Sequence, residues 1–228
     1  VFSDVQKETL LLDPLLLEEK ITPGTRAVIA VDYAGQTCDY EALRQLADSH
    51  ELVLVADACH ALGAEFKGRK AGSLADLNVF SFHPVKPITT GEGGMITTND
   101  PKLAQRMRIF RNHGITTDHR QREQRGSWFY EMVDLGYNYR LTDLQCALGL
   151  SQLRKLPEWV KRRQQIAQRY DEAFAEIPAV EPLGVRDDVS HAYHLYMIRL
   201  NLSKLRVTRA EVFSALRAEG IGVNVHYI

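Results

Sequence analysis

The amino-acid sequence predicts an α/β fold with a central, mostly parallel sheet, helices on both of its faces, and a small α+β domain near the C-terminal end. Residues 26–33 and 52–56 are apolar, largely β-branched runs of the length expected for buried parallel strands. Between them Asp39 can cap an amphipathic helix that begins at Tyr40. A strand, a helix and a strand within about thirty residues form a βαβ unit, whose crossover is right-handed.

The next elements complete the predicted large domain. Residues 77–82 and 94–98 are two further short strands, and Pro101 opens a helix that we expect to run to about Arg111. Residues 115–131 are polar and lack a helical or strand period, so the sequence predicts a loop there.

Two helices follow this loop. Apolar residues recur at helical spacing in 141–156 and again in 158–174, and Pro157 separates the two patterns. The predicted domains are residues 1–155 for the large domain, 156–177 for a linking helix and 178–228 for the small domain.

The small domain begins where the sequence pattern changes near residue 178. We expect a strand over 194–200, a helix over 208–219 that ends before Gly220, and a last strand over 223–227. Residues 1–6 have the pattern of a strand already under way, and the last residues stop in mid-strand. We therefore expect the chain to be a fragment of a longer protein.

Composition excludes several classes of partner. The net charge is −1 and no apolar run approaches the ~20 residues needed to span a bilayer, so we expect no nucleic-acid and no membrane partner. Cys38, Cys59 and Cys146 are odd in number and widely spaced, which favours a reducing, cytoplasmic compartment over a disulfide framework. None of them has the spacing of a metal site.

Lys86 is the residue that says most about chemistry. It lies between an apolar strand and a glycine turn, in the run Ser81-Phe-His-Pro-Val-Lys-Pro-Ile-Thr-Thr-Gly-Glu-Gly-Gly94. An amine in a desolvated pocket loses its proton more easily, and a neutral amine is the nucleophile that forms a Schiff base with an aldehyde. The alternative is a solvated loop lysine.

Three more polar residues follow the ends of predicted strands, where open parallel sheets bind ligands. Asp57 is either a turn residue or a carboxylate that keeps a pyridine ring cationic, which makes that ring an electron sink. His60 either begins a helix or donates to the ring's phenolic oxygen. Ser81 could cap Thr89 or contact a phosphate oxygen.

Several motifs occur in an order that resembles the DegT/DnrJ/EryC1/StrS family of pyridoxal-phosphate sugar aminotransferases, and they span nearly all of the chain. The matching segments are Val31-Asp-Tyr-Ala-Gly35, Asp57-Ala-Cys-His-Ala-Leu-Gly63, Gly72-Ser73, Ser81 to Gly94, Arg111-Asn-His-Gly114, Gly136-Tyr-Asn-Tyr-Arg-Leu-Thr-Asp143 and Val225-His-Tyr227. The first of these, the Lys-Pro-Ile-Thr-Thr run and His194-Leu-Tyr196 are most similar to the pseudaminic acid branch. Members of that branch aminate C4 of a UDP-linked 4-keto-6-deoxy N-acetylamino sugar.

The resemblance implies a fold-type I transferase that uses pyridoxal 5'-phosphate. By position, Lys86 bonds to the cofactor aldehyde and moves the proton, and Asp57 pairs with the pyridine nitrogen. His60 contacts the ring oxygen and Ser81 the cofactor phosphate. The partners implied are a nucleotide sugar and an amino-acid donor, L-glutamate in most relatives.

The same resemblance implies a homodimer with shared active sites. Asn138 maps to the family residue that reaches the partner's phosphate, with Arg140 as the neighbouring candidate. His226 and Tyr227 map near the sugar nucleotide, although a packed strand end would explain them as well. The family's phosphate loop and stacking aromatic residue precede the region where this chain begins, so we expect an incomplete pocket.

Other functions remain as alternatives. A cofactor-dependent sugar dehydratase has the same fold, but its members carry His in place of the Schiff-base lysine, so Lys86 speaks against it. A non-catalytic or truncated paralogue that only dimerises is a second alternative. A nicotinamide-binding enzyme would need a Gly-x-Gly-x-x-Gly motif after the first strand, and this chain has none.

Overall fold

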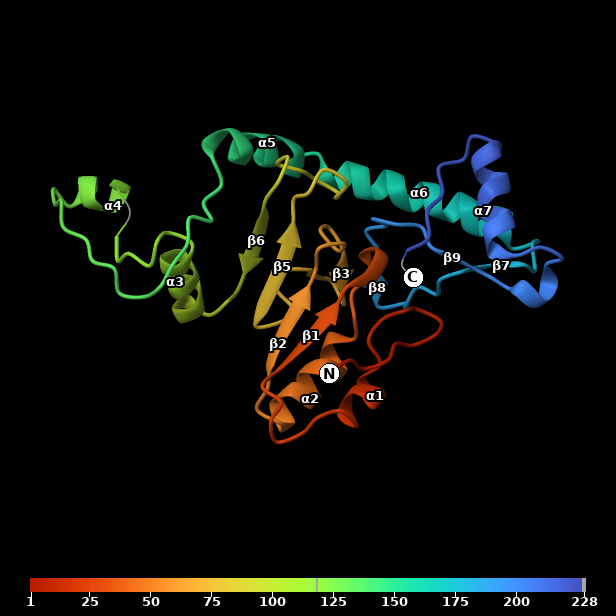
Figure 1. Ribbon diagram of the computed structural model, residues 1–228, viewed down its shortest axis with the longest axis horizontal. Helices are drawn as coiled ribbons and strands as arrows, with labels where there is room; N and C mark the ends of the chain where they lie inside the picture. The colour runs from red at the N-terminus through yellow and green to blue at the C-terminus, as the bar shows by residue number, and fades with distance from the viewer. Residues whose placement is uncertain (118, 227–228) are drawn as a thin grey trace.

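The structure, a computed structural model, describes residues 1–117 and 119–226. Its centre is a four-stranded sheet in the order β1-β2-β5-β6 (Figure 1). The strands are β1 (Ala27–Val31), β2 (Val53–Asp57), β5 (Leu77–Ser81) and β6 (Gly94–Thr97). β1, β2 and β5 are parallel and β6 is antiparallel to β5, which confirms the mostly parallel sheet.

The strand register brings polar residues together at one edge of this sheet. Val31 lies opposite Asp57 and Asp57 lies opposite Val79, so the carboxyl ends of three strands are side by side. The backbone N–H of Asp32, which directly follows β1, donates to the Asp57 carbonyl oxygen at 3.0 Å. This edge therefore carries Asp32, Asp57 and Ser81.

Helix α2 (Tyr40–Ser49) covers one face of the sheet. The Asp39 side chain caps it by accepting from the Ala42 N–H at 3.1 Å, as the sequence predicts. Its buried side chains join a core cluster with the inward-facing residues of β1 and β2, which are Val28, Ala30, Leu54 and Ala56. The short helix α1 (Pro14–Glu18) packs beside α2.

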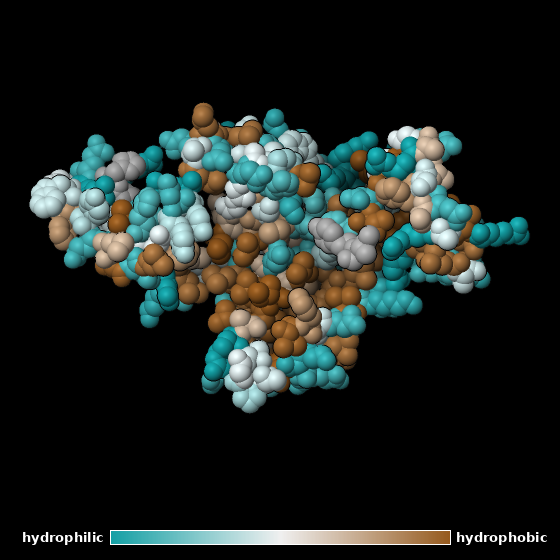
Figure 2. All heavy atoms as spheres, viewed as in Figure 1, coloured by the Kyte–Doolittle hydropathy of each residue, from teal (hydrophilic) through white to brown (hydrophobic). Residues whose placement is uncertain are grey.

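The other face of β1 and β2 is open in this chain. The side chains that alternate with the core residues are exposed, at 66% for Ile29, 44% for Val31 and 43% for Val53. Figure 2 shows apolar surface gathered over the middle of the visible face, where the sheet lies in Figure 1.

Four helices follow the sheet, and two of them differ from prediction. They are α3 (Pro101–Phe110), α4 (His119–Gln124), α5 (Asp143–Leu153) and α6 (Leu156–Phe174). α4 lies inside the segment predicted as a loop, because a short polar helix has no apolar face to reveal it. Pro157 lies in the first turn of α6 rather than between two helices, where its missing N–H costs no hydrogen bond.

The C-terminal part contains β7 (Val180–Pro182), β8 (Val189–Ser190), β9 (Ile198–Leu200), the 3-10 turn η2 (Leu202–Lys204) and α7 (Arg209–Ala218). β7 pairs with β9, and β8 joins the hairpin of β3 (Glu65–Phe66) and β4 (Arg69–Lys70). The helix predicted over 208–219 is confirmed, and Gly220 follows it with φ of +78°.

Three predicted strands are shorter than expected or missing. Only residues 198–200 of the 194–200 run form a strand, because residues 192–195 bond to a turn instead of a ladder. Residues 223–226 form no strand, and Tyr227 lies outside the described residues. Among residues 1–6 only Val5 makes a bridge, to Leu12, since no neighbouring strand is there to extend it.

Residues 184–195 lie against the carboxyl edge of the sheet. The turn η1 (Tyr33–Gly35) accepts two of their N–H groups, from Ala192 to the Gly35 oxygen at 2.9 Å and from Leu195 to the Ala34 oxygen at 3.1 Å. The division into domains stays a prediction. Within the part of the chain that the structure describes, no helix is long and apolar enough to cross a membrane.

Candidate active site

Lys86 lies in the loop that joins β5 to β6. The base of the loop is closed by backbone bonds from Phe82 N to the Gly93 oxygen at 2.9 Å and from Thr90 N to the Phe82 oxygen at 3.0 Å. Lys86 N donates to the His83 oxygen at 3.0 Å, which forms a tight turn. Ile88 is buried in the second core cluster, so the chain is anchored directly after the half-buried lysine.

Helix α5 fixes the other side of this loop. The Gln152 side chain exchanges two hydrogen bonds with the Thr89 backbone, accepting from its N–H at 3.2 Å and donating to its oxygen at 2.9 Å. Gln145 Nε2 donates to the Glu92 oxygen at 2.9 Å. The loop that carries Lys86 is therefore held from both ends of α5.

Asp57 and Lys86 act on the same neighbour, Cys59. The Cys59 N–H donates to Asp57 Oδ1 at 3.1 Å. The pKa of the Cys59 thiol is raised to about 12, chiefly by burial and also by the hydrogen bond and charge of Asp57, while the Lys86 charge opposes the shift. Asp57 and Lys86 thus both lie near enough to Cys59 for their charges to act on its thiol.

His60 lies between the same two charges. The pKa of His60 is lowered to about 4, chiefly by burial and also by the positive charges of Lys86 and His226, while Asp57 opposes them. His60 is therefore a neutral imidazole near pH 7. The structure thus brings together Asp57, His60, Lys86 and His226, four of the residues singled out from the sequence.

Two more rings join this group. The His60 ring lies 4.5 Å from the His194 ring, 5.9 Å from that of His226 and 6.1 Å from that of Tyr33, centroid to centroid. Tyr33 Oη donates to the His226 carbonyl oxygen at 3.1 Å. Burial lowers the pKa of His194 to about 3, and the charges of His60 and Lys86 contribute. We call these four rings the ring cluster.

The other predicted site residues, Ser81, Asn138 and Arg140, lie outside this group. Ser81 is half-buried at the end of β5, and its Oγ accepts from the His83 N–H at 3.3 Å. Asn138 and Arg140 are exposed on the segment after α3, where Asn138 bridges to Asn112 and Arg140 Nη1 donates to Asn112 Oδ1 at 2.7 Å. The described contacts of Asn138 and Arg140 do not include Asp57 or Lys86.

Three residues at the site were not identified from the sequence. Tyr33 and His194 belong to motifs that carry the resemblance, yet nothing local shows that they meet. Asp32 follows an apolar strand much as Asp57 does, and this position could have identified it from the sequence. The approach of His194 to His60 depends on contacts between segments far apart in the chain.

The polar atoms of this group suit a hydrogen-bonding ligand. His60 Nδ1 and His194 Nδ1 are buried without a hydrogen-bond partner among the described residues. Buried polar atoms are normally paired, so two that are not indicate a ligand with donors or acceptors. The carboxylate of Asp57 and the amine of Lys86 fit the ring nitrogen and the aldehyde of pyridoxal 5'-phosphate. No group of three or more possible metal ligands occurs among residues 1–117 and 119–226.

Comparison with known families decides the class. The model of the DegT/DnrJ/EryC1/StrS aminotransferase family matches residues 1–228. The chain belongs to this family. Its fold is that of the fold-type I transferases that use pyridoxal phosphate, as the sequence motifs imply.

Individual relatives agree with this. The spore coat polysaccharide biosynthesis protein SpsC of Bacillus subtilis is 44% identical over 100% of the chain and 59% of SpsC. A Campylobacter jejuni UDP-4-amino-4,6-dideoxy-N-acetyl-beta-L-altrosamine transaminase is 40% identical over 95% of the chain and 56% of its own length. The structure of Helicobacter pylori PseC, an aminotransferase of pseudaminic acid biosynthesis, superposes with a TM-score of 0.90 at 36% identity, covering 100% of the chain and 59% of PseC. The chain thus spans about three fifths of these relatives.

Proposed function

We propose that this protein is a pyridoxal 5'-phosphate-dependent aminotransferase that moves an amino group from an amino acid to a nucleotide-linked keto sugar. The observation that supports this best is the shared influence of Asp57 and Lys86 on His60 and Cys59. One small ring between the carboxylate and the amine could contact both. The bound cofactor would supply an electron sink for the carbon that loses its proton.

Each residue then has a role that its surroundings support. Asp57 holds the proton on the ring nitrogen through its negative charge, because an opposite charge nearby favours the protonated ring. Lys86 would be the amine that holds the cofactor through its aldehyde carbon and would serve as the proton carrier at that carbon. His60 is neutral and donates to the ring oxygen, and Ser81 donates to the phosphate.

A second copy of the chain completes the site in this proposal. Asn138 and Arg140 are exposed and held by Asn112, so they are presented outward on the segment after α3. We assign Asn138 to the phosphate bound by the partner subunit and Arg140 to the substrate. The proposed assembly is a homodimer with two shared sites.

The acceptor sugar is the finer part of the proposal. The Campylobacter relative is named for a UDP-4-amino-4,6-dideoxy sugar, and PseC for pseudaminic acid biosynthesis. We therefore propose amination at C4 of a UDP-4-keto-6-deoxy-N-acetylamino sugar, with L-glutamate as donor and with His226 and Tyr227 near the sugar nucleotide. The free thiols of Cys38, Cys59 and Cys146 fit a cytoplasmic location.

A labelling experiment tests the central claim. The protein is incubated with pyridoxal 5'-phosphate, reduced with borohydride and digested, and the modified peptide is identified by mass spectrometry. We expect a visible absorbance band before reduction and the label on Lys86. Lys86→Ala should lose both, whereas the control Lys102→Ala, at an exposed position on α3, should keep both.

Two results would reject the proposal. Label on several surface lysines but not on Lys86 would indicate a non-catalytic relative. Label on Lys86, with consumption of the keto sugar but no amino product when L-glutamate is present, would favour the dehydratase.

A further inference from the structure

Asp32 is a second carboxyl group at the sheet edge, and no role has been assigned to it above. It directly follows β1 and is only 1% exposed. Its backbone N–H donates to the carbonyl oxygen of Asp57 at 3.0 Å. Two carboxyl groups therefore lie at adjacent strand ends, one fully buried and one half-buried.

Only one oxygen of the Asp32 carboxyl, Oδ1, accepts hydrogen bonds among the described residues. Oδ1 accepts from the Cys38 N–H at 2.9 Å and from Tyr40 Oη at 2.9 Å. Oδ2 is buried without a hydrogen-bond partner in the described part of the chain. These two bonds close the loop from Asp32 to Tyr40.

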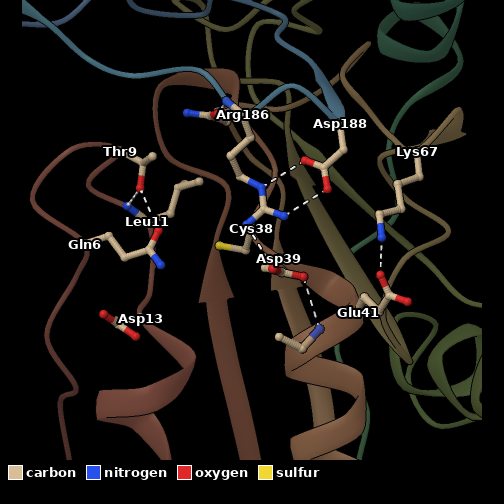
Figure 3. A network of polar contacts seen from close by, with 12 residues as sticks. Gln6, Thr9, Leu11, Asp13, Cys38, Asp39, Glu41, Lys67, Arg186 and Asp188 are labelled. Carbon is tan, nitrogen blue, oxygen red and sulfur yellow. Dashed lines mark hydrogen bonds and ion pairs between the residues drawn. The ribbon is translucent and has the colours of Figure 1, made fainter.

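No cation compensates this carboxyl. Among the described residues Asp32 takes part in no ion pair, and Arg186, whose charge acts on Cys38, is held by Asp39 at 2.9 Å and by Asp188 at 2.9 Å. Figure 3 shows Arg186 pointing toward these two carboxylates. A fully buried charge without a counter-ion is costly, so the carboxyl is favoured in its neutral form.

The electrostatics agree with this geometry. The pKa of Asp32 is raised to about 7, chiefly by burial; the bonds from Cys38 and Tyr40 oppose this shift, and the negative charge of Asp57 adds to it. Burial raises the pKa of both the Cys38 thiol and the Tyr40 hydroxyl, so Tyr40 remains a donor near neutral pH.

The loop that Asp32 closes positions part of the ring cluster. It carries Tyr33, whose hydroxyl bonds to the His226 backbone, and the turn carbonyls of Ala34 and Gly35. Those carbonyls bind the segment that places His194 beside His60. A change at Asp32 is therefore transmitted to two rings of the cluster and to the strand end of Asp57.

We propose that Asp32 is a positioning residue whose carboxyl stays protonated well above the pH range in which aspartates usually ionise, closing the Asp32–Tyr40 loop while adding little negative charge beside Asp57. Its importance for cofactor binding rests on the proposed function. The protonation of Asp32 does not rest on the proposed function, because it follows from the burial of Asp32 and from the neighbouring carboxylate of Asp57.

The first test is a carboxyl titration of the protein without cofactor, followed by ¹³C NMR. We expect one aspartate with a midpoint near pH 7, absent in Asp32→Asn and unchanged in the control Asp4→Asn at the exposed N-terminal segment. In Asp57→Asn the midpoint of Asp32 should move to lower pH, because a neighbouring negative charge has been removed. If every aspartate titrates below pH ~5, near the ordinary range of this side chain, the proposal is overturned.

The second test compares two substitutions by their affinity for pyridoxal 5'-phosphate. Asp32→Asn keeps a neutral group with an acceptor oxygen, so its Kd should stay within about threefold of the wild type, whereas Asp32→Ala should weaken binding by about tenfold or more. Equal losses in both variants would refute the neutral carboxyl. Should Asp32→Ala fail to fold, the titration and Asp32→Asn still decide. Wild-type protein that binds no cofactor would refute the proposed function while leaving the titration valid.

Discussion

The sheet edge and the segment between α3 and α5 are built in different ways. Asp32 and Asp57 lie at the ends of strands with buried residues, and Lys86 lies in the β5–β6 loop. Hydrogen bonds from Cys38 and Tyr40 hold Asp32, one from Cys59 reaches Asp57, and side chains of α5 hold the Lys86 loop. The described residues 111–117 and 119–140 are joined to one another by the bridges Asn112 to Asn138 and Ile115 to Met132. Contacts with the core of this chain thus position the residues of the first region, whereas the residues of the second region lie exposed on its surface.

The second segment also exposes large apolar side chains. Large rings and aliphatic groups on the second segment face solvent, among them Trp128 at 84%, Met132 at 72%, Leu135 at 69% and Tyr139 at 65%. Clustered exposed apolar groups mark a surface that is covered in the functional assembly. Residues at the sheet edge should therefore act within one subunit, and Asn138 across a subunit boundary.

Of the substitutions that test this difference, Asp57→Ala should have the largest effect, on cofactor affinity. Removing one partner of a desolvated charge pair costs about 3 kcal/mol or more, so the Kd for the cofactor should rise by roughly a hundredfold or more. Absorbance titration with pyridoxal 5'-phosphate measures it. Asp134→Ala, at an exposed position of the second region, is the control and should bind normally. An unchanged Kd in Asp57→Ala would remove the sheet edge as the cofactor site.

Mixing two inactive variants tests whether Asn138 acts across the boundary. Lys86→Ala and Asn138→Ala should each be strongly impaired, because each lacks one contribution to the site. After unfolding and refolding together, about half of the dimers are mixed and each holds one intact site, so about a quarter of wild-type activity should return. The control mixture combines Lys86→Ala with Asp57→Ala, which change two residues that one subunit contributes to the same site. This mixture should regain no activity. Lack of recovery in the test mixture would place Asn138 in the same subunit as Lys86.

Gln152→Ala should have a smaller effect, because it loosens the Lys86 loop without touching the lysine. It removes two hydrogen bonds to the Thr89 backbone, worth about 1–2 kcal/mol together, so kcat should fall by about tenfold. Gln168→Ala is the control, since Gln168 on α6 bonds only to exposed Glu172 in the described contacts. Equal rates in the two variants would show that α5 does not position the loop.

The smallest effect concerns acid stability. The pKa of His60 is lowered to about 4 in the folded protein, so the unfolded state takes up a proton first as the pH falls. The stability linked to His60 is therefore fully present above about pH 6.5 and is lost between pH 6.5 and 4. His60→Gln should show a shallower decrease of Tm over this interval than the wild type, measured by calorimetry. Parallel curves would mean that His60 titrates normally.

Much of the fold could be predicted because its signals are local. The apolar runs of β1 and β2, the Asp39 cap and the turn at Gly220 each depend on a few neighbouring residues. The strand predicted over 194–200 was too long, because the N–H groups of Ala192 and Leu195 bond to a distant turn. Such partners are not encoded in the local pattern.

The candidate site divides in the same way. Asp57, Ser81 and Lys86 were identified because each follows the end of an apolar strand or its loop. His194 and Tyr33 could not be identified as neighbours of His60, since their approach depends on two segments from opposite ends of the chain. The role of Asn138 depends on a second subunit and stays a prediction.

The tight turn at Ala34 and Gly35 has a consequence for the order of folding. Ala34 has φ of +58°, and a Cβ on Gly35 would lie 2.9 Å from the backbone nitrogens of Tyr193 and His194, so the late segment fits only onto this shape. The β1-α2-β2 unit can form while a ribosome is still making residue 100, but the ring cluster must wait for residue 226. In refolding monitored by hydrogen exchange, the amides of Ala192 and Leu195 should gain protection after those of β1 and β2, so cofactor capture becomes a late step in maturation.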